Sequence, residues 1–218
     1  MKRFGNQKWK VVISFLLCLC PLFAGLILWN RLPDPMPIHF NLQGEIDNYG
    51  SKLLVVVGMG LFMAALHLLC LYVTTKDPEN GNVSDTVMDL TVWAVPAISL
   101  FVSFMIYSAA LGTQLPVSRI MSFGLGLFYL VVGNYLPKTR KNHTIGIRIP
   151  WTLNDREVWD KTHRFGGFVM MAAGALLVGC WLFRVELNDA VMTVLTLLPL
   201  ALVIGYSGFL YYRKRAIR

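Results

Sequence analysis

Apolar residues dominate the chain in six runs of about 20 residues, which short polar segments separate. An α-helix rises 1.5 Å per residue, so each run is long enough to cross a hydrocarbon core of about 30 Å. Backbone groups in lipid must be hydrogen-bonded within their own segment, which favours helices. We therefore predict an all-α integral membrane protein with six transmembrane helices. The predicted spans are Val11–Trp29, Leu53–Val73, Leu90–Leu111, Val117–Leu136, Phe165–Arg184 and Ala190–Tyr212.

The composition supports this fold class, because 56% of the 218 residues are hydrophobic and only 15% are charged. Soluble domains usually carry about 25% charged residues, so an ordinary soluble fold is excluded. All four cysteines fall inside predicted helices and lack the spacing of a zinc site, which predicts packing thiols and no bound metal or cofactor. These cysteines are Cys18, Cys20, Cys70 and Cys180.

The positions of Lys and Arg predict the orientation in the membrane. With the N-terminus inside, sixteen Lys and Arg residues face the cytoplasm and four face outside. This asymmetry predicts that both termini are cytoplasmic. The net charge of +8 then reflects the orientation bias and an attraction for anionic lipids, and we expect no direct binding of nucleic acid.

The first loop, residues 31–52, is predicted to lie outside the cell and to have a structure of its own. Its prolines hold the chain extended, and Gly44 marks a turn. Two short strands are expected around Pro37–Leu42 and Glu45–Tyr49, joined by Gln43 and Gly44. A loop of about 20 residues is longer than a simple connection requires.

The most polar block of the chain is residues 137–164, here called the basic loop, which is predicted to be cytoplasmic. It contains seven Lys and Arg residues and three acidic residues. Alternating Ile145, Ile147 and Ile149 favour an extended segment. Thr152 then predicts a capped helix start at Leu153, from which the chain continues into the fifth membrane helix. Gly166 and Gly167 would let that helix approach a neighbour closely.

These features suggest two parts: an N-terminal two-helix unit, residues 1–75, that carries the first loop, and a four-helix unit, residues 76–218, that carries the basic loop.

Histidines are the main candidates for catalytic or metal chemistry. His39 lies near acidic residues in the first loop, and His143 and His163 lie near acidic residues in the basic loop. The alternative is that each is structural, because zinc needs three or four protein ligands and neither HExxH nor a nucleophile elbow is present. We favour a non-enzymatic protein. His67, inside the second helix, is expected to pack with a single hydrogen bond.

Two long motifs resemble known families. Asn134–Lys138 reads NxxPK, Asn142–Leu153 reads NxxxGIRxPWTL, and Trp159–Gly167 reads WxxTHRxGG. Together they resemble the signature of the SdpI family, the immunity proteins against a secreted sporulation-delaying toxin. Leu32–Lys52, which reads LPxxxPxHFNxxGxxDxYGSK, resembles an uncharacterised domain usually found N-terminal to that signature.

This resemblance implies a bacterial plasma-membrane protein that gives resistance to a secreted peptide toxin. It also implies signal transduction, in which the protein holds a cytoplasmic ArsR-like transcriptional repressor at the membrane. A small transporter or exporter of an amphipathic peptide is the alternative. The oligomeric state stays open.

Two sets of residues are the candidate sites under this interpretation. The candidates for partner binding in the basic loop and its flanks are Asn134, Pro137, Asn142, Gly146, Arg148, Pro150, Trp151, Trp159, His163 and Arg164. The candidates in the first loop are Pro37, His39, Gly44, Asp47 and Lys52.

Overall fold

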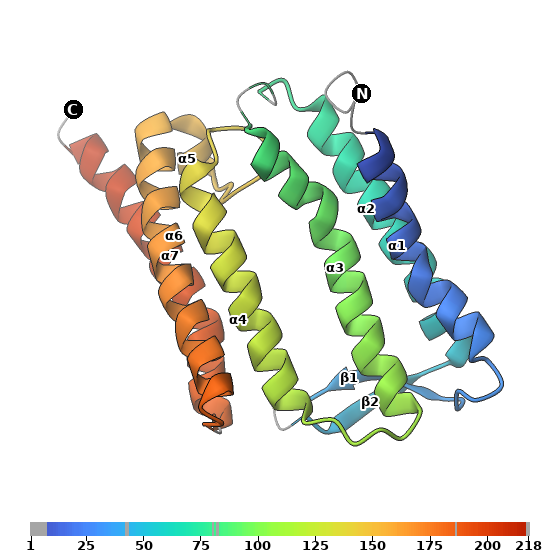
Figure 1. The fold of residues 1–218 in the computed structure, drawn as a ribbon. Helices are drawn as coiled ribbons and strands as arrows, with labels where there is room; N and C mark the ends of the chain where they lie inside the picture. The colour runs from blue at the N-terminus through green and yellow to red at the C-terminus, as the bar shows by residue number, and fades with distance from the viewer. Residues whose placement is uncertain (1–7, 42–43, 80, 82, 186, 217–218) are drawn as a thin grey trace. The chain divides into compact units, whose positions relative to one another are not determined.

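The computed structural model describes residues 8–41, 44–79, 81, 83–185 and 187–216, and it confirms the six long apolar helices (Figure 1). Each is long and apolar enough to cross a membrane, so the chain is a multi-pass membrane protein. The helices are α1 (Lys8–Ile27), α2 (Met59–Lys76, after a π-helical turn at Leu54–Gly58), α3 (Asp85–Ala110), α4 (Val117–Tyr135, followed by a 3-10 turn at Leu136–Lys138), α5 (Pro150–Asn154), α6 (Arg156–Leu182) and α7 (Asp189–Ala216).

Contacts divide the chain into two compact units. The first comprises the chain up to Lys76 together with Met88–Val117, and the second comprises Asp77–Val87 and Ser118–Arg218. Most of α3 therefore groups with α1 and α2, whereas the division drawn from the sequence at 75/76 placed it with the C-terminal helices. Hydropathy identifies spans without saying which of them are neighbours.

The first unit is held together by a core that joins helices to the first loop. Ile106 and Tyr107 of α3 pack with Val55 and Val56, and all four side chains are largely buried. The Tyr107 hydroxyl donates a hydrogen bond of 2.9 Å to the backbone oxygen of Pro21, which lies inside α1.

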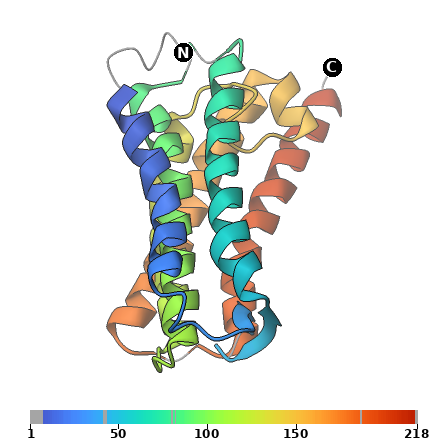
Figure 2. The same cartoon turned by 90° about the vertical axis from the view of Figure 1, so that its right-hand side faces the viewer.

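The first loop forms the predicted hairpin from β1 (Met36–Phe40) and β2 (Ile46–Gly50), which pair antiparallel. Figure 2 shows it where α1 ends and α2 begins. Gly44 has a φ of +83°, which confirms the predicted turn, whereas Leu42 and Gln43 lie outside the described residues. Met36 is fully buried in the first unit's core, so the hairpin is anchored to the helix ends.

In the second unit, α6 packs lengthwise against α7 and approaches α4 through glycines. A Cβ added at Gly133 of α4 would lie 2.8 Å from the backbone oxygen of Gly167, and one added at Gly174 would lie 2.7 Å from that of Gly126. Each helix therefore presents two glycines seven residues apart at the same contact. The close approach predicted from Gly167 is confirmed.

The start of the fifth membrane helix differs from the prediction. The chain forms the short α5 from Pro150 and then begins α6 at Arg156, so the helix does not run on from Leu153. The N-cap of α6 is Asp155, whose side chain accepts from the backbone N–H groups of Glu157 and Val158. Asp155 has an extended backbone, φ −138° and ψ 116°, which interrupts the helix.

Candidate functional site

The basic loop is built around the fully buried side chain of Asn142. Its Oδ1 accepts from the backbone N–H groups of Thr144, at 2.9 Å, and Ile145, at 2.6 Å. Its Nδ2 donates to the backbone oxygens of Arg140, at 2.8 Å, and Ile145, at 3.0 Å. Both ends of the amide are thus hydrogen-bonded to the loop backbone, so this side chain shapes the loop and offers little to a partner.

Behind this turn, Trp159 and His163 of α6 stack at 4.0 Å between ring centroids, and both are buried. Trp159 Nε1 donates to the backbone oxygen of Thr139 at 2.8 Å. His163 Nε2 accepts from the backbone N–H of Ile147 at 3.0 Å, so the ring carries its proton on Nδ1, which donates to the backbone oxygen of Trp159 at 2.9 Å. The two rings therefore hold the backbone at Thr139 and at Ile147 against α6.

Gly146 lies directly over these rings. Its φ is +116°, a region that side chains rarely adopt, and an added Cβ would overlap His163 Nε2. Glycine at this position is therefore required both by the backbone and by the space above the stacked pair.

The turn before α5 is closed by Thr152. Its hydroxyl accepts from the backbone N–H of Ile149 at 3.1 Å and donates to the backbone oxygen of Ile147 at 2.7 Å. Pro150 is the first residue of α5, where its missing N–H costs no helical hydrogen bond. Trp151 packs on α7, where its Nε1 donates to the Ser207 hydroxyl at 2.9 Å.

A third attachment comes from the α2–α3 connector, which sequence reasoning did not include in the site. The buried carboxylate of Asp77 accepts from the backbone N–H of His143 at 2.7 Å and from the Thr144 hydroxyl. Glu79 adds an ion pair with Lys141 at 3.6 Å, and its Oε2 lies 3.9 Å from His143 Nε2. Sixty-six residues separate Asp77 from His143, so no local pattern indicated this contact.

The protonation of Asp77 follows from these bonds. Burial by itself raises the pKa of the carboxyl, but the hydrogen bonds from Thr144, Glu79 and His143 outweigh burial and hold the pKa below its ordinary value of 3.8. The group is therefore a carboxylate at neutral pH.

A second acidic pair ties the start of α6 to the end of α7. Lys214 Nζ lies 2.7 Å from Asp155 Oδ2 and 2.8 Å from Glu157 Oε2, and Glu157 also pairs with Lys161 at 2.7 Å. The hydrogen bond from Lys214 is the largest cause of the lowered pKa of Asp155. These contacts neutralise two of the three acids of the basic loop.

The remaining predicted residues lie on the surface. Arg148 is exposed, and its Nη1 donates to the backbone oxygen of His143 at 2.7 Å. Arg164 is exposed on α6, and Asn134 accepts from Lys138 Nζ at 3.1 Å. Pro137 is also exposed. Its ring lies so close to Gly167 that a Cβ added to that glycine would be 2.5 Å from it. The structure thus separates a buried frame (Asn142, Trp159 and His163) from exposed cations that a partner can reach.

The first loop brings together some of its predicted residues. His39 Nδ1 lies 2.6 Å from Asp47 Oδ1 across the hairpin, on the exposed side. Lys52 Nζ donates to the backbone oxygens of Trp29, at 3.2 Å, and Leu32, at 3.0 Å, and so holds the turn that follows α1. Pro37 is buried in β1, opposite Tyr49.

Two further features lie within the helices. His67 is fully buried, and its Nε2 lies 2.9 Å from the Ser14 hydroxyl, which matches the single hydrogen bond expected for a packed histidine. Among the described residues, no three His, Cys, Asp or Glu side chains are grouped so that they could hold a metal ion.

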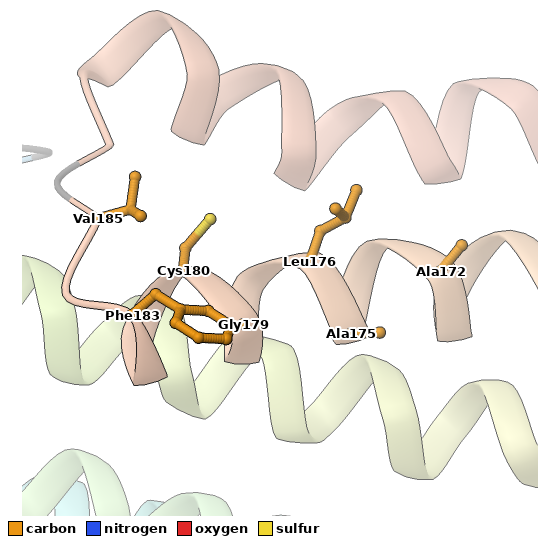
Figure 3. Close-up of a pocket in the computed structure, with 7 residues that line it drawn as sticks. All are labelled: Ala172, Ala175, Leu176, Gly179, Cys180, Phe183 and Val185. Atoms are coloured by element: carbon orange, nitrogen blue, oxygen red, sulfur yellow. The ribbon is translucent and has the colours of Figure 1, made fainter.

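An open apolar groove runs along α6 towards its C-terminal end (Figure 3). The lining residues are Ala172, Ala175, Leu176, Gly179, Cys180, Phe183 and Val185. None of these side chains carries a charge, and Phe183 is 82% exposed, so the surface suits lipid chains.

Comparison with known proteins finds two matched segments in the chain. Residues 138–212 match the model of the SdpI/YfhL protein family. This segment is therefore similar to that family. Residues 16–64, which cover most of α1, the hairpin and the start of α2, match a domain of unknown function, DUF1648. Both resemblances predicted from the motifs are confirmed.

A full-length relative extends the similarity. The Immunity protein SdpI of Bacillus subtilis (strain 168) is 27% identical over 209 residues, which cover 94% of this chain and 97% of that protein. No solved structure matches the chain. The SdpI/YfhL segment holds the basic loop from Lys138 onward, α6 and most of α7, whereas Asp77 lies outside both matched segments.

Proposed function

We propose that this chain is a bacterial membrane immunity protein that protects its cell from a secreted peptide toxin. The observation that carries the proposal is the near end-to-end similarity to Immunity protein SdpI, which includes both matched segments. Six membrane-spanning helices are consistent with a protein that meets a toxin at the bilayer.

The test is protection of a sensitive cell. A toxin-sensitive Bacillus strain that lacks its own immunity gene should survive the sporulation-delaying toxin when it expresses this chain, and it should die when it carries an empty vector. Continued sensitivity, with the protein shown by immunoblot to accumulate in the membrane, would refute the proposal for that toxin.

We further propose that the chain is a signal transducer whose basic loop holds a cytoplasmic repressor at the membrane. The support is physical. The loop backbone is fixed by the buried Asn142, Trp159 and His163, and it displays the exposed Arg148 on that frame. Ordered frames that present arginine are common at protein interfaces.

Arg148→Ala tests this second step. The side chain is exposed and loses only its hydrogen bond to the His143 backbone oxygen, so insertion should be unchanged, while membrane capture of an ArsR-like repressor in toxin-treated cells should fall about tenfold. Arg213→Ala removes another exposed cation, from the last turn of α7, and this variant should capture the repressor normally. Equal capture by both variants would remove Arg148 from the interface.

A further inference from the structure

The connector between α2 and α3 supplies an acidic ligand to the basic loop from within the chain. Asp77 and Glu79 follow α2 directly, but contacts group residues 77–87 with the second unit. Asp77 is 8% exposed and accepts both hydrogen bonds of the 143–144 turn. Burying a carboxylate costs its desolvation, so the hydrogen bonds from the 143–144 turn must offset that cost.

The donors that bind Asp77 form a small carboxylate-binding edge. It consists of the His143 N–H and the Thr144 hydroxyl, with the Lys141 ammonium beside Glu79. Asn142 positions the turn, since its Oδ1 binds the N–H groups of Thr144 and Ile145. The edge is thus preorganised by residues of the SdpI/YfhL segment, whereas its occupant lies outside both matched segments.

We propose that residues 77–79 form a removable strap over this edge, and that the edge binds an acidic segment of a partner protein when the strap is released. The partner's carboxylate would take the place of Asp77 at His143 N–H and Thr144, and a second acid would take the place of Glu79 at Lys141. This inference rests on the proposed capture of a protein partner and identifies the chemistry that the partner presents.

The strap is joined directly to α2, so a movement of that helix could release it. Asp77 directly follows Lys76, the last residue of α2, and α2 belongs to the unit that carries the first loop. A change in the end of α2 therefore acts on Asp77 without any further contact. While attached, the strap has an effective concentration on the order of millimolar, so a free acidic segment competes only after release.

The first experiment measures hydrogen–deuterium exchange of full-length protein in detergent, in the peptide that covers residues 140–149. Asp77→Asn should speed this exchange about tenfold, because a hydrogen bond to a charged acceptor is replaced by a weaker neutral one. Asp160→Asn removes an exposed carboxylate from α6 and should change nothing. If Asp77→Asn fails to accumulate, Thr144→Val removes one donor alone and should give a smaller acceleration. If exchange is unchanged in Asp77→Asn, the strap proposal is wrong. Where Thr144→Val has to be used instead, unchanged exchange in that variant leads to the same conclusion.

The second experiment supplies the acid in trans to a full-length Asp77→Asn/Glu79→Gln protein. A synthetic peptide of residues 76–85, KDPENGNVSD, at about 1 mM should restore slow exchange of residues 140–149. The same peptide with Asn at position 77 and Gln at position 79 should not. Failure of the acidic peptide to restore protection overturns the docking edge. Neither experiment uses toxin or repressor, so failure here is distinct from failure of the immunity proposal.

Discussion

At the scale of single residues, the conformation of the basic loop depends on positions that accept only one type of amino acid. Gly146 combines a φ of +116° with a position directly against His163, and Asn142 meets four backbone groups with one amide. Both belong to the motif that resembled the SdpI family, so the motif consists largely of residues that shape the loop. Arg148, from the same motif, is an exposed cation.

Gly146→Ala should destabilise the protein by about 1–3 kcal/mol, because alanine is strained at this φ and its Cβ overlaps the His163 ring. Thermal unfolding in detergent measures the change. Gly179→Ala is the matched control, since a Cβ there meets nothing within 4 Å and alanine favours a helix. An unfolding temperature for Gly146→Ala equal to that of the control would contradict the reported loop conformation.

The strap should also respond to acid. A group whose folded pKa is lowered contributes stability above its unfolded pKa and loses it as pH falls through the folded pKa. The pKa values of Asp77 and Asp155 lie below 3.8, so slow exchange of residues 140–149 should persist from pH 7 to about pH 4 and be lost only below that. Exchange rates are compared after correction for intrinsic pH dependence. In Asp77→Asn the contribution of Asp77 to this transition should be absent. In the unmodified protein, loss of protection already at pH 6 would contradict the lowered pKa values of Asp77 and Asp155.

At the scale of elements, the contact between α4 and α6 is made by backbone against backbone. Gly126 and Gly133 on α4 meet Gly174 and Gly167 on α6 at distances that leave no room for a methyl group. Helices in lipid gain little from apolar burial against one another, so close packing of this kind provides much of their association.

Gly133→Ala should therefore cost about 1–3 kcal/mol, since the added Cβ would lie 2.8 Å from the Gly167 oxygen and must push the helices apart. Unfolding in detergent provides the measurement. Gly205→Ala, on α7, is the control because a Cβ there meets nothing within 4 Å. Two variants of equal stability would show that the glycine contact is unimportant.

At the scale of the whole molecule, the distribution of Lys and Arg predicts that the basic loop and both termini share the cytoplasmic side. His143→Cys and Tyr49→Cys place thiols at positions where the native side chains are 50% and 53% exposed. An impermeant thiol reagent on intact cells should label the Tyr49 variant and should label the His143 variant only after permeabilisation. The unmodified chain, whose described cysteines all lie in helices, measures background. Labelling of the His143 variant in intact cells would reverse the orientation.

Much of the local structure could be predicted from the amino-acid pattern. The six spans follow from length and hydropathy alone, because lipid requires each segment to satisfy its own backbone. The hairpin and its turn at Gly44 follow from short-range turn chemistry. The start of α6 was misplaced because Thr152 and Asp155 both resemble caps, and only the loop geometry decides that Thr152 bonds Ile149 while Asp155 caps the helix.

The sequence by itself determined the membrane helices, the family motifs and the turn at Gly44, since each depends on neighbours close in the chain. Only the tertiary structure decided that α3 packs with α1 and α2, that Trp159 lies inside the basic loop, and that Asp77 binds a turn 66 residues away. Such contacts depend on which helices become neighbours. Apolar spans that are equally compatible with lipid carry little information about that choice, so it is made by shape and by buried hydrogen bonds.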